Sequence, residues 1–445
     1  MKIDIQEQID SARLGALNYV LLAVTMLVMF VDGFDVFVVG RIAPAIAHGL
    51  GEPTSKMGEV FLLQQVGLAV GAFSISPLAD RYGRRAILAL TLAAFGSLTI
   101  AGAFATSLRD LALLRGLAGV FLSGAVPTVL ALLVEMTPQR RRSTFLSISL
   151  SAYAAGSALC AGVAAWLLAA HGWRIAFWIG GIAPLGCLTL VAALPESIMF
   201  RLARDPLDPR IARTLRRLTA AAHFDVAQEF MPVPPRHKPA IFDVVSEGRG
   251  VSSMLLWLCT FIHMGTTALL ASWMSTFFLE MAGVPLARFS VSLIIAVVGG
   301  LAGTFMAGVL MDRFGWPKVL SVYFGALTLS VAALGMVPFS SGAFILVLIA
   351  WSFFQSGGQA GLTTLLTRLY PANARSTGIG WGTGVGRLGG VALPLFGGFA
   401  LASKFSLSAT FWLICLMPAL VLCLLWVLSA VRPRGLDADL VCAVA

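Results

Sequence analysis

Two carboxylates lie in an otherwise almost wholly apolar stretch, FVDGFDVFVVG at residues 30–40. Asp32 and Asp35 are three residues apart, so on a helix they share one face. A charge in the middle of a membrane costs roughly 2.5–3.5 kcal/mol on insertion scales. That face is therefore expected to point into a helix bundle, where acids are typical of proton relays. Between the two acids, Gly33 leaves room for another helix or a substrate to approach closely.

Arg115 is the expected partner of this acid pair. Asp35 lies about one turn before the end of the first apolar run, and Arg115 lies about one turn after the start of the fourth. That end and that start are both expected on the outer side of the membrane, so the two residues are expected at a similar depth. We predict a charge triad of Asp32, Asp35 and Arg115. Two acids that face one arginine cannot both ionise cheaply, which would leave one of them able to carry a proton. The alternative is a static ion pair that only holds helices together.

Arg387 is a second charge in an apolar run. It lies about ten residues into the run 377–402, which is about 15 Å along a helix and near the middle of a membrane. Neither this run nor its neighbours in the sequence contains Asp or Glu. The planar guanidinium binds a carboxylate at two points, so we predict that Arg387 binds a substrate carboxylate. Pairing with Asp32 or Asp35 is the alternative.

Other polar and aromatic side chains are expected at a comparable depth. An aromatic anion needs a flat apolar slot with a few directed polar groups. Each aromatic residue could instead pack only against helices or lipid, and a buried histidine could be a titrating group or a hydrogen-bonded structural one. The candidates for a substrate site are Phe34, Tyr153, His263, Gln355, Gln359 and Trp381, with Trp273 and Trp351 as further aromatic surface.

The composition places these residues in a polytopic membrane protein. The 445 residues are 58% hydrophobic and only 12% charged, with a mean hydropathy of +0.89, whereas soluble domains carry roughly 25% charged residues. At about 20 residues per membrane helix, the chain has room for roughly twelve. The polar first 15 residues lead into a full-length apolar run without a small-residue cleavage site, so we expect this first span to be retained.

Apolar runs between charged or Pro/Gly-rich breaks predict an all-α protein with twelve transmembrane helices in two pseudo-symmetric halves of six. A long polar stretch follows the sixth run. We expect an N-terminal half at 1–194, a central cytoplasmic loop at 195–252, a C-terminal half at 253–431 and a cytoplasmic tail at 432–445. The expected spans are 17–39, 58–79, 86–106, 111–134, 144–170, 175–194, 253–279, 288–311, 318–338, 342–367, 377–402 and 406–430.

The net charge of +10 is explained by where the basic residues lie in the expected topology, so it does not indicate a nucleic-acid partner. Loops on the side of the N-terminus hold the arginines of residues 81–85 and 140–142 and the basic central loop, whereas the opposite loops hold only scattered cations. The positive-inside rule then predicts that both termini lie in the cytoplasm. Contact with lipid headgroups is an additional use open to the central basic residues.

A short motif occurs twice, once in each half. SPLADRYGRRAIL (76–88) follows the second expected span, and GVLMDRFGWPKVL (308–320) follows the eighth. Equivalent turns at equivalent points of two halves indicate a duplicated transporter architecture. The residues shared in register are Leu78 and Leu310, Asp80 and Asp312, Arg81 and Arg313, Gly83 and Gly315, and Leu88 and Leu320.

This motif resembles the G-x-L-x-D-R-x-G-R-R signature of the major facilitator superfamily, although Ser76 replaces the first glycine. Three further stretches narrow the resemblance to the aromatic acid:proton symporters of that superfamily: DGFD in the first span, LPES after the sixth, and RLYPANARSTGIGWGTGVGRLGG at residues 368–390. The similarity extends over essentially the whole transmembrane chain. The resemblance implies inward transport of a benzoate-like anion coupled to protons.

The superfamily pattern also implies a cytoplasmic charge network. Such a network would latch the two halves in the outward-facing state and would break when the transporter turns inward. The alternative is a solvated loop in which the acid caps the next helix. The residues expected in this gating role are Asp80, Arg81, Gly83, Arg84, Glu135, Arg140, Asp312 and Arg313.

Taken together, the sequence predicts a proton-coupled symporter that imports an aromatic carboxylate, acts as a monomer within membrane lipid, and uses no cofactor besides the proton. An exporter of drugs or metabolites with the same fold is the main alternative, but the fifth span lacks the Gly-Pro break that many such exporters carry. No nucleophile–base pair, metal cluster or phosphate-binding loop suggests an enzyme.

Overall fold

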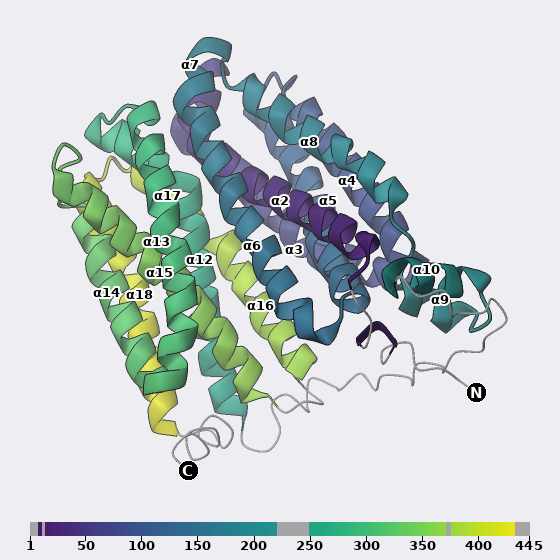
Figure 1. Cartoon of the computed structure of the whole chain (residues 1–445). Coiled ribbons are helices and arrows are strands. Elements are labelled where there is room, and N and C mark those ends of the chain that lie inside the picture. Colours follow the sequence, from purple (N-terminus) through teal and green to yellow (C-terminus); the bar gives the residue numbers. More distant parts are fainter. Residues whose placement is uncertain (1–7, 11–13, 220–248, 371–374, 432–445) are drawn as a thin grey trace. The chain divides into compact units, whose positions relative to one another are not determined.

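A computed structural model describes residues 8–10, 14–219, 249–370 and 375–431. Within this part of the chain, twelve helical segments are long and apolar enough to cross a membrane, and each overlaps one of the expected spans. The colours of Figure 1 follow these helices along the chain. The prediction of an all-α polytopic fold with six spans on either side of a central segment is therefore confirmed.

The elements before the central segment are α2 (Ala16–Gly49), the short 3-10 helix Thr54–Lys56, α3 (Met57–Tyr82), α4 (Arg84–Gly102), α5 (Leu108–Met136), α6 (Gln139–Gly162), the π-helical turn Val163–Leu167, α7 (Leu168–His171) and α8 (Arg174–Ala193). The later elements are α9 (Ile198–Arg204), α10 (Pro209–Thr219), α12 (Gly250–Ala282), α13 (Leu286–Phe314), α14 (Trp316–Leu334), α15 (Gly342–Leu369), α16 (Arg375–Ala392), α17 (Leu395–Ala402) and α18 (Leu407–Val431).

The chain forms two compact units, whose bounds cut through three helices. The first unit comprises Met1–Val38, Val66–Cys160 and Trp173–Arg236, and the second comprises Val39–Gln65, Ala161–Gly172 and His237–Ala445. The boundary in α6 falls next to its π-helical turn. The division into halves at residues 194 and 253 remains a prediction, and the expected tail at 432–445 lies outside the described residues.

In the first unit, glycines let helix backbones cross at close range. A Cβ atom on Gly33 of α2 would lie 2.0 Å from the carbonyl oxygen of Tyr153 in α6, and one on Gly156 of α6 would lie 1.9 Å from that of Phe30. Helices α3 and α5 cross in the same way, because a Cβ on Gly67 would lie 1.9 Å from the carbonyl oxygen of Gly116. Small residues at such crossings are typical of membrane helix packing.

The central segment, residues 195–252, contributes two helices, α9 and α10, to the core of the first unit. Ser197 caps α9, since its hydroxyl accepts a hydrogen bond from the backbone N–H of Phe200 at 3.1 Å. Helix α10 is amphipathic: its apolar residues at i, i+4 and i+7 are fully buried in the same hydrophobic cluster as the inner faces of α2, α4 and α5. Those apolar residues are Ile211, Leu215 and Leu218.

In the second unit, α12 packs on α16 and α18, α13 packs on α15, and α14 packs on α15 and α18. A cluster of phenylalanines from four of these helices fills one end of the unit. Its closest pair is Phe278 and Phe289, which stack at 4.6 Å between ring centroids. These aromatic side chains therefore form part of the core of the second unit.

The repeated motif forms the same turn twice. Gly83 joins α3 to α4 with φ +105° and ψ 139°, and Gly315 joins α13 to α14 with φ +79° and ψ 148°. Each glycine N–H closes the preceding helix by donating to the carbonyl four residues earlier, at 3.1 Å in both cases. The positive φ explains why both copies carry glycine at this position.

Candidate functional site

Asp35 and Arg115 form a two-point ion pair in the first unit. Arg115 Nη1 donates to Asp35 Oδ1 at 2.8 Å, and Arg115 Nη2 donates to Asp35 Oδ2. Both side chains are 1% exposed. The structure thus brings together the acid on α2 and the arginine on α5 that the sequence places at one depth.

Asp32 lies one turn before Asp35 on α2 and is half-buried. Gly33, between them, is the position at which the backbone of α6 crosses α2. Tyr153 of α6 lies at that crossing and is half-buried, and its ring is 6.0 Å from the ring of Phe37. Phe34 is 3% exposed and lies beside Gly180 of α8, so its ring packs in the core of the unit.

A second polar group lies in the second unit, between α12 and α15. The amide nitrogen of Gln355 donates to the hydroxyl of Thr267 and lies 3.5 Å from His263 Nε2. Thr267 in turn donates to the backbone carbonyl of His263 at 2.8 Å. His263 and Gln355 are 2% and 6% exposed, and the ring of Phe324 lies edge-on to the imidazole at 5.3 Å. His263 and Gln355 were expected at a substrate site, whereas Thr267 was not.

The remaining substrate candidates lie on α15 and α16. Gln359 is half-buried one turn beyond Gln355, with its amide nitrogen 3.5 Å from the hydroxyl of Thr363. Arg387 is half-buried in α16. Trp381 is 45% exposed and stacks on Trp257 of α12 at 6.0 Å.

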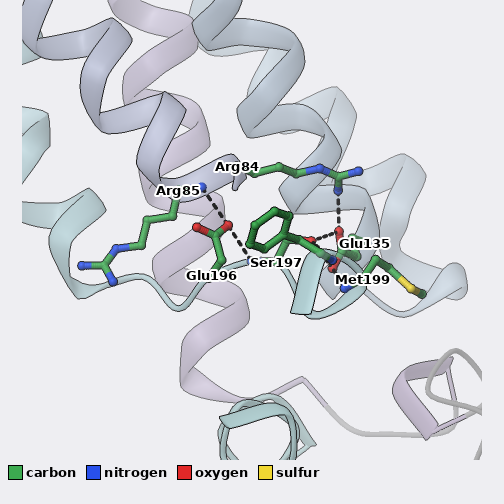
Figure 2. Close-up of polar contacts among 7 residues, drawn as sticks. Arg84, Arg85, Glu135, Glu196, Ser197 and Met199 are labelled. Carbon is green, nitrogen blue, oxygen red and sulfur yellow. Dashed lines mark hydrogen bonds and ion pairs between the residues drawn. The ribbon is translucent and has the colours of Figure 1, made fainter. Parts of the chain in front are cut away.

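Glu135 at the end of α5 is the centre of a buried polar cluster (Figure 2). Its carboxylate accepts hydrogen bonds from the guanidinium of Arg84, from the Ser197 hydroxyl at 2.8 Å, and from the backbone N–H of Met199 at 2.8 Å. The side chain of Glu135 is 5% exposed and that of Arg84 is 22% exposed. The cluster therefore joins the ends of α4 and α5 to the start of α9, all within the first unit.

Glu196 extends the same cluster toward the α3–α4 turn. Its Oε1 accepts from the backbone N–H groups of Arg85 and Ser197, both at 2.9 Å (Figure 2). Arg85 Nη2 donates to the carbonyl of Ala192 at 2.7 Å, at the end of α8. A Cβ on Gly83 would lie only 2.6 Å from Glu196 Oε2. Glu196, Ser197 and Arg85 were not predicted, although LPES is among the stretches that carry the family resemblance.

The other gating candidates lie at helix ends. The guanidinium of Arg81 lies 5.5 Å from the ring of Tyr82, and that of Arg313 lies 5.3 Å from the ring of Phe314. Asp312, which is 72% exposed, accepts from Arg368 at 2.6 Å. Arg140 is exposed at the start of α6, and the side chain of Asp80 lies outside the described part of the structure.

In the part of the chain that the structure describes, twelve helices able to cross a membrane, two buried charge pairs and a turn that occurs twice are typical of a polytopic membrane transporter. In the described residues, no group of three or more His, Cys, Asp or Glu side chains could hold a metal ion. Comparison with solved structures supports the fold: the inward-open xylose transporter XylE from E. coli superimposes with a TM-score of 0.74 at 16% identity, over 96% of this chain and 99% of XylE.

The chain belongs to the Major Facilitator Superfamily, whose profile matches residues 25–285 and again 256–439. It is 32% identical to the gallate transporter of Pseudomonas putida over 93% of this chain and 92% of that protein. It is 30% identical to the 4-hydroxybenzoate transporter PcaK of Acinetobacter baylyi, over 91% of this chain and 89% of that protein. These relatives are transporters of aromatic acids, and the predicted family resemblance is confirmed.

Proposed function

We propose that this protein imports an aromatic carboxylate across the bacterial cytoplasmic membrane together with protons. The observation that carries the proposal is the buried Asp35–Arg115 pair, with Asp32 one turn away on the same helix. Both partners of the pair are almost fully removed from water, which costs several kcal/mol per ion unless the pairing is good. The names of the relatives supply the substrate class, since they are transporters of gallate, 4-hydroxybenzoate and benzoate.

Proton coupling follows from the two acids near one arginine. When Asp32 and Asp35 compete for Arg115, protonation of one relieves the repulsion between them. A proton that enters with a monoanionic substrate makes the step electroneutral, whereas two protons let the membrane potential contribute about 2.3 kcal/mol per 100 mV. We propose that the triad binds the coupling proton and that Arg387 binds the substrate carboxylate at two points.

The cytoplasmic cluster around Glu135 is proposed to act during the transport cycle. Its hydrogen bonds fix α9 to the ends of α4 and α5, so their formation and loss would accompany movement of these helix ends. We also propose that both termini lie in the cytoplasm and that the protein works as a monomer in membrane lipid.

The test is uptake of radiolabelled 4-hydroxybenzoate into proteoliposomes that hold the purified protein, under an imposed inward proton gradient. We expect accumulation that requires the gradient, collapses with a protonophore, and is reduced by unlabelled aromatic acids. Liposomes without protein provide the background. If no aromatic acid enters or competes, while a cationic drug is driven outward in exchange for protons, the protein is an exporter of the same fold.

A further inference from the structure

Two buried polar atoms on α15 have no hydrogen-bond partner in the described structure. They are Trp351 Nε1, which can only donate, and Gln355 Oε1, which can only accept. Trp351 and Gln355 are four residues apart, so they share a helix face and are separated by about 6 Å along the axis. Each unsatisfied group costs about 1–3 kcal/mol, which calls for a ligand or a water molecule at this point.

The surrounding hydrogen bonds determine which way the Gln355 amide points. The hydroxyl of Thr267 has one hydrogen, and it already donates that hydrogen to the carbonyl of His263 at 2.8 Å. Its contact with Gln355 must therefore be accepted from the amide NH₂ group. This orientation leaves the side-chain carbonyl of Gln355 as the atom that needs a donor.

The neighbourhood of the Gln355 amide is aromatic. The ring of Phe324 lies against His263, and Gly358 packs against both, since a Cβ there would lie 3.2 Å from Phe324 Cζ and 3.4 Å from His263 Cε1. Tyr323, the residue before Phe324 in α14, has its ring 5.4 Å from that of Phe354 in α15. An unpaired donor and an unpaired acceptor in such apolar surroundings suit a ligand with one hydroxyl group on a flat ring.

We propose that Trp351 and Gln355 bind a hydroxyl group on the aromatic ring of the substrate. The Trp351 N–H donates to the phenolic oxygen, and the phenolic O–H donates to the Gln355 carbonyl. A phenol satisfies both atoms at once because its oxygen is a donor and an acceptor. The inference rests on the proposed function and adds to it the substrate class, namely ring-hydroxylated aromatic acids rather than unsubstituted ones.

Discrimination against the unsubstituted acid follows from the unpaired groups. A site built to hydrogen-bond a substrate hydroxyl rejects an analogue that lacks it, because the buried partners are then left unsatisfied. Thr267 and His263 act as positioning residues, since they hold the amide of Gln355 in the orientation that exposes its carbonyl to the ligand.

The test compares the inhibition constants of 2-, 3- and 4-hydroxybenzoate and of benzoate against uptake of a radiolabelled hydroxybenzoate in proteoliposomes. The variants are Gln355→Met and Trp351→Phe, which each remove one hydrogen-bonding atom and keep most of the side-chain volume. Thr364→Val is the matched control, because the Thr364 hydroxyl bonds to the carbonyl of Ala360 in its own helix. We expect each of the two variants to weaken the preferred hydroxybenzoate about ten-fold, as the loss of one hydrogen bond predicts, and to change benzoate by less than two-fold.

Three outcomes would overturn the inference. Equal weakening of the hydroxylated and unsubstituted acids would mean that the two residues only shape the site. Unchanged constants in both variants would mean that water satisfies the two atoms. A wild-type protein that takes up both acids equally would refute hydroxyl recognition while still supporting aromatic-acid transport. Absence of uptake of any aromatic acid would instead refute the proposed function itself.

Discussion

Asp35 and Arg115, 80 residues apart in the chain, meet as a two-point ion pair with both side chains 1% exposed. The parallel geometry satisfies both carboxylate oxygens with guanidinium N–H groups, which is the strongest form of this interaction. Removing one partner from such a pair leaves an uncompensated buried charge, and the cost is much larger than the net gain from forming the pair. Substitutions in and near the pair can therefore test the stability of the protein and its transport activity separately.

The first prediction concerns stability. Arg115→Met leaves the Asp35 carboxylate buried without its counter-charge, so we expect a loss of about 3–5 kcal/mol in the free energy of unfolding. Thermal melting in detergent would measure it. The double variant Asp35→Leu, Arg115→Met should recover most of the lost stability while remaining inactive in transport. Equal melting of the single variant and the wild type would contradict the burial of an intact ion pair.

The second prediction concerns coupling. Asp32→Asn and Asp35→Asn each remove a proton-binding carboxylate, so neither variant should accumulate substrate against its gradient when an inward proton gradient is imposed. Exchange of labelled for unlabelled substrate across the membrane, which needs no net proton movement, serves as the control for a folded carrier. Full uphill uptake by both variants would show that the coupling proton binds elsewhere.

Much of this architecture can be predicted from the sequence, because hydropathy alone locates membrane helices. The twelve spans appear where expected, and the depth argument brings Asp35 to Arg115 correctly. Helix lengths are less predictable. Helix α2 continues to Gly49, ten residues beyond the expected end, and includes Arg41, which is 6% exposed. A hydropathy criterion ends a span at such a residue, whereas a helix inside a bundle can bury it.

Contacts between distant polar residues are the part that the sequence does not reveal. Glu196 and Ser197 become partners of Arg85 and Glu135 only because α9 folds back on the helix ends. A signal for α9 and α10 was present, since Ser197 is a favoured N-cap and Pro209 a favoured first helical residue. Thr267 gave no such signal, because a threonine among apolar residues looks the same whether or not it orients a glutamine.

The third prediction tests the proposed anion site. Arg387→Lys keeps the positive charge but loses the planar fork that binds a carboxylate at two points, so we expect the apparent affinity for the aromatic acid to fall by at least about ten-fold, or roughly 1.4 kcal/mol. Uptake kinetics in proteoliposomes would measure this. Lys318→Arg, at the start of α14, is a control for a conservative change at another cation. Unchanged affinity in Arg387→Lys would place the carboxylate site elsewhere.

The fourth prediction concerns the duplicated turn. Gly83→Ala faces two penalties, since the residue has φ +105° and its Cβ would lie 2.6 Å from Glu196 Oε2. We expect a loss of at least about 1 kcal/mol in the free energy of unfolding, in line with the cost of strained backbone positions. Gly308→Ala is the control in the second copy of the motif, because nothing lies within 4 Å of its Cβ position. Equal melting temperatures for the two variants would contradict the strain at Gly83.

The fifth prediction concerns the attachment of α9. Glu135→Ala removes the acceptor for the Ser197 hydroxyl, the Met199 N–H and the Arg84 guanidinium together. Each bond to a charged acceptor contributes about 1.5–3 kcal/mol, so α9 should open far more often while the apolar core of α5 stays folded. Hydrogen exchange of the α9 amides, such as the Arg201 N–H that donates to the Ser197 carbonyl, would report this opening.

Asp312→Ala is the matched control, because the Asp312 side chain in its ion pair with Arg368 is 72% exposed and such surface pairs contribute little to stability. We expect faster exchange in α9 for Glu135→Ala and unchanged exchange there for Asp312→Ala. If α9 keeps its protection in both variants, its apolar contacts rather than the Glu135 cluster hold it in place.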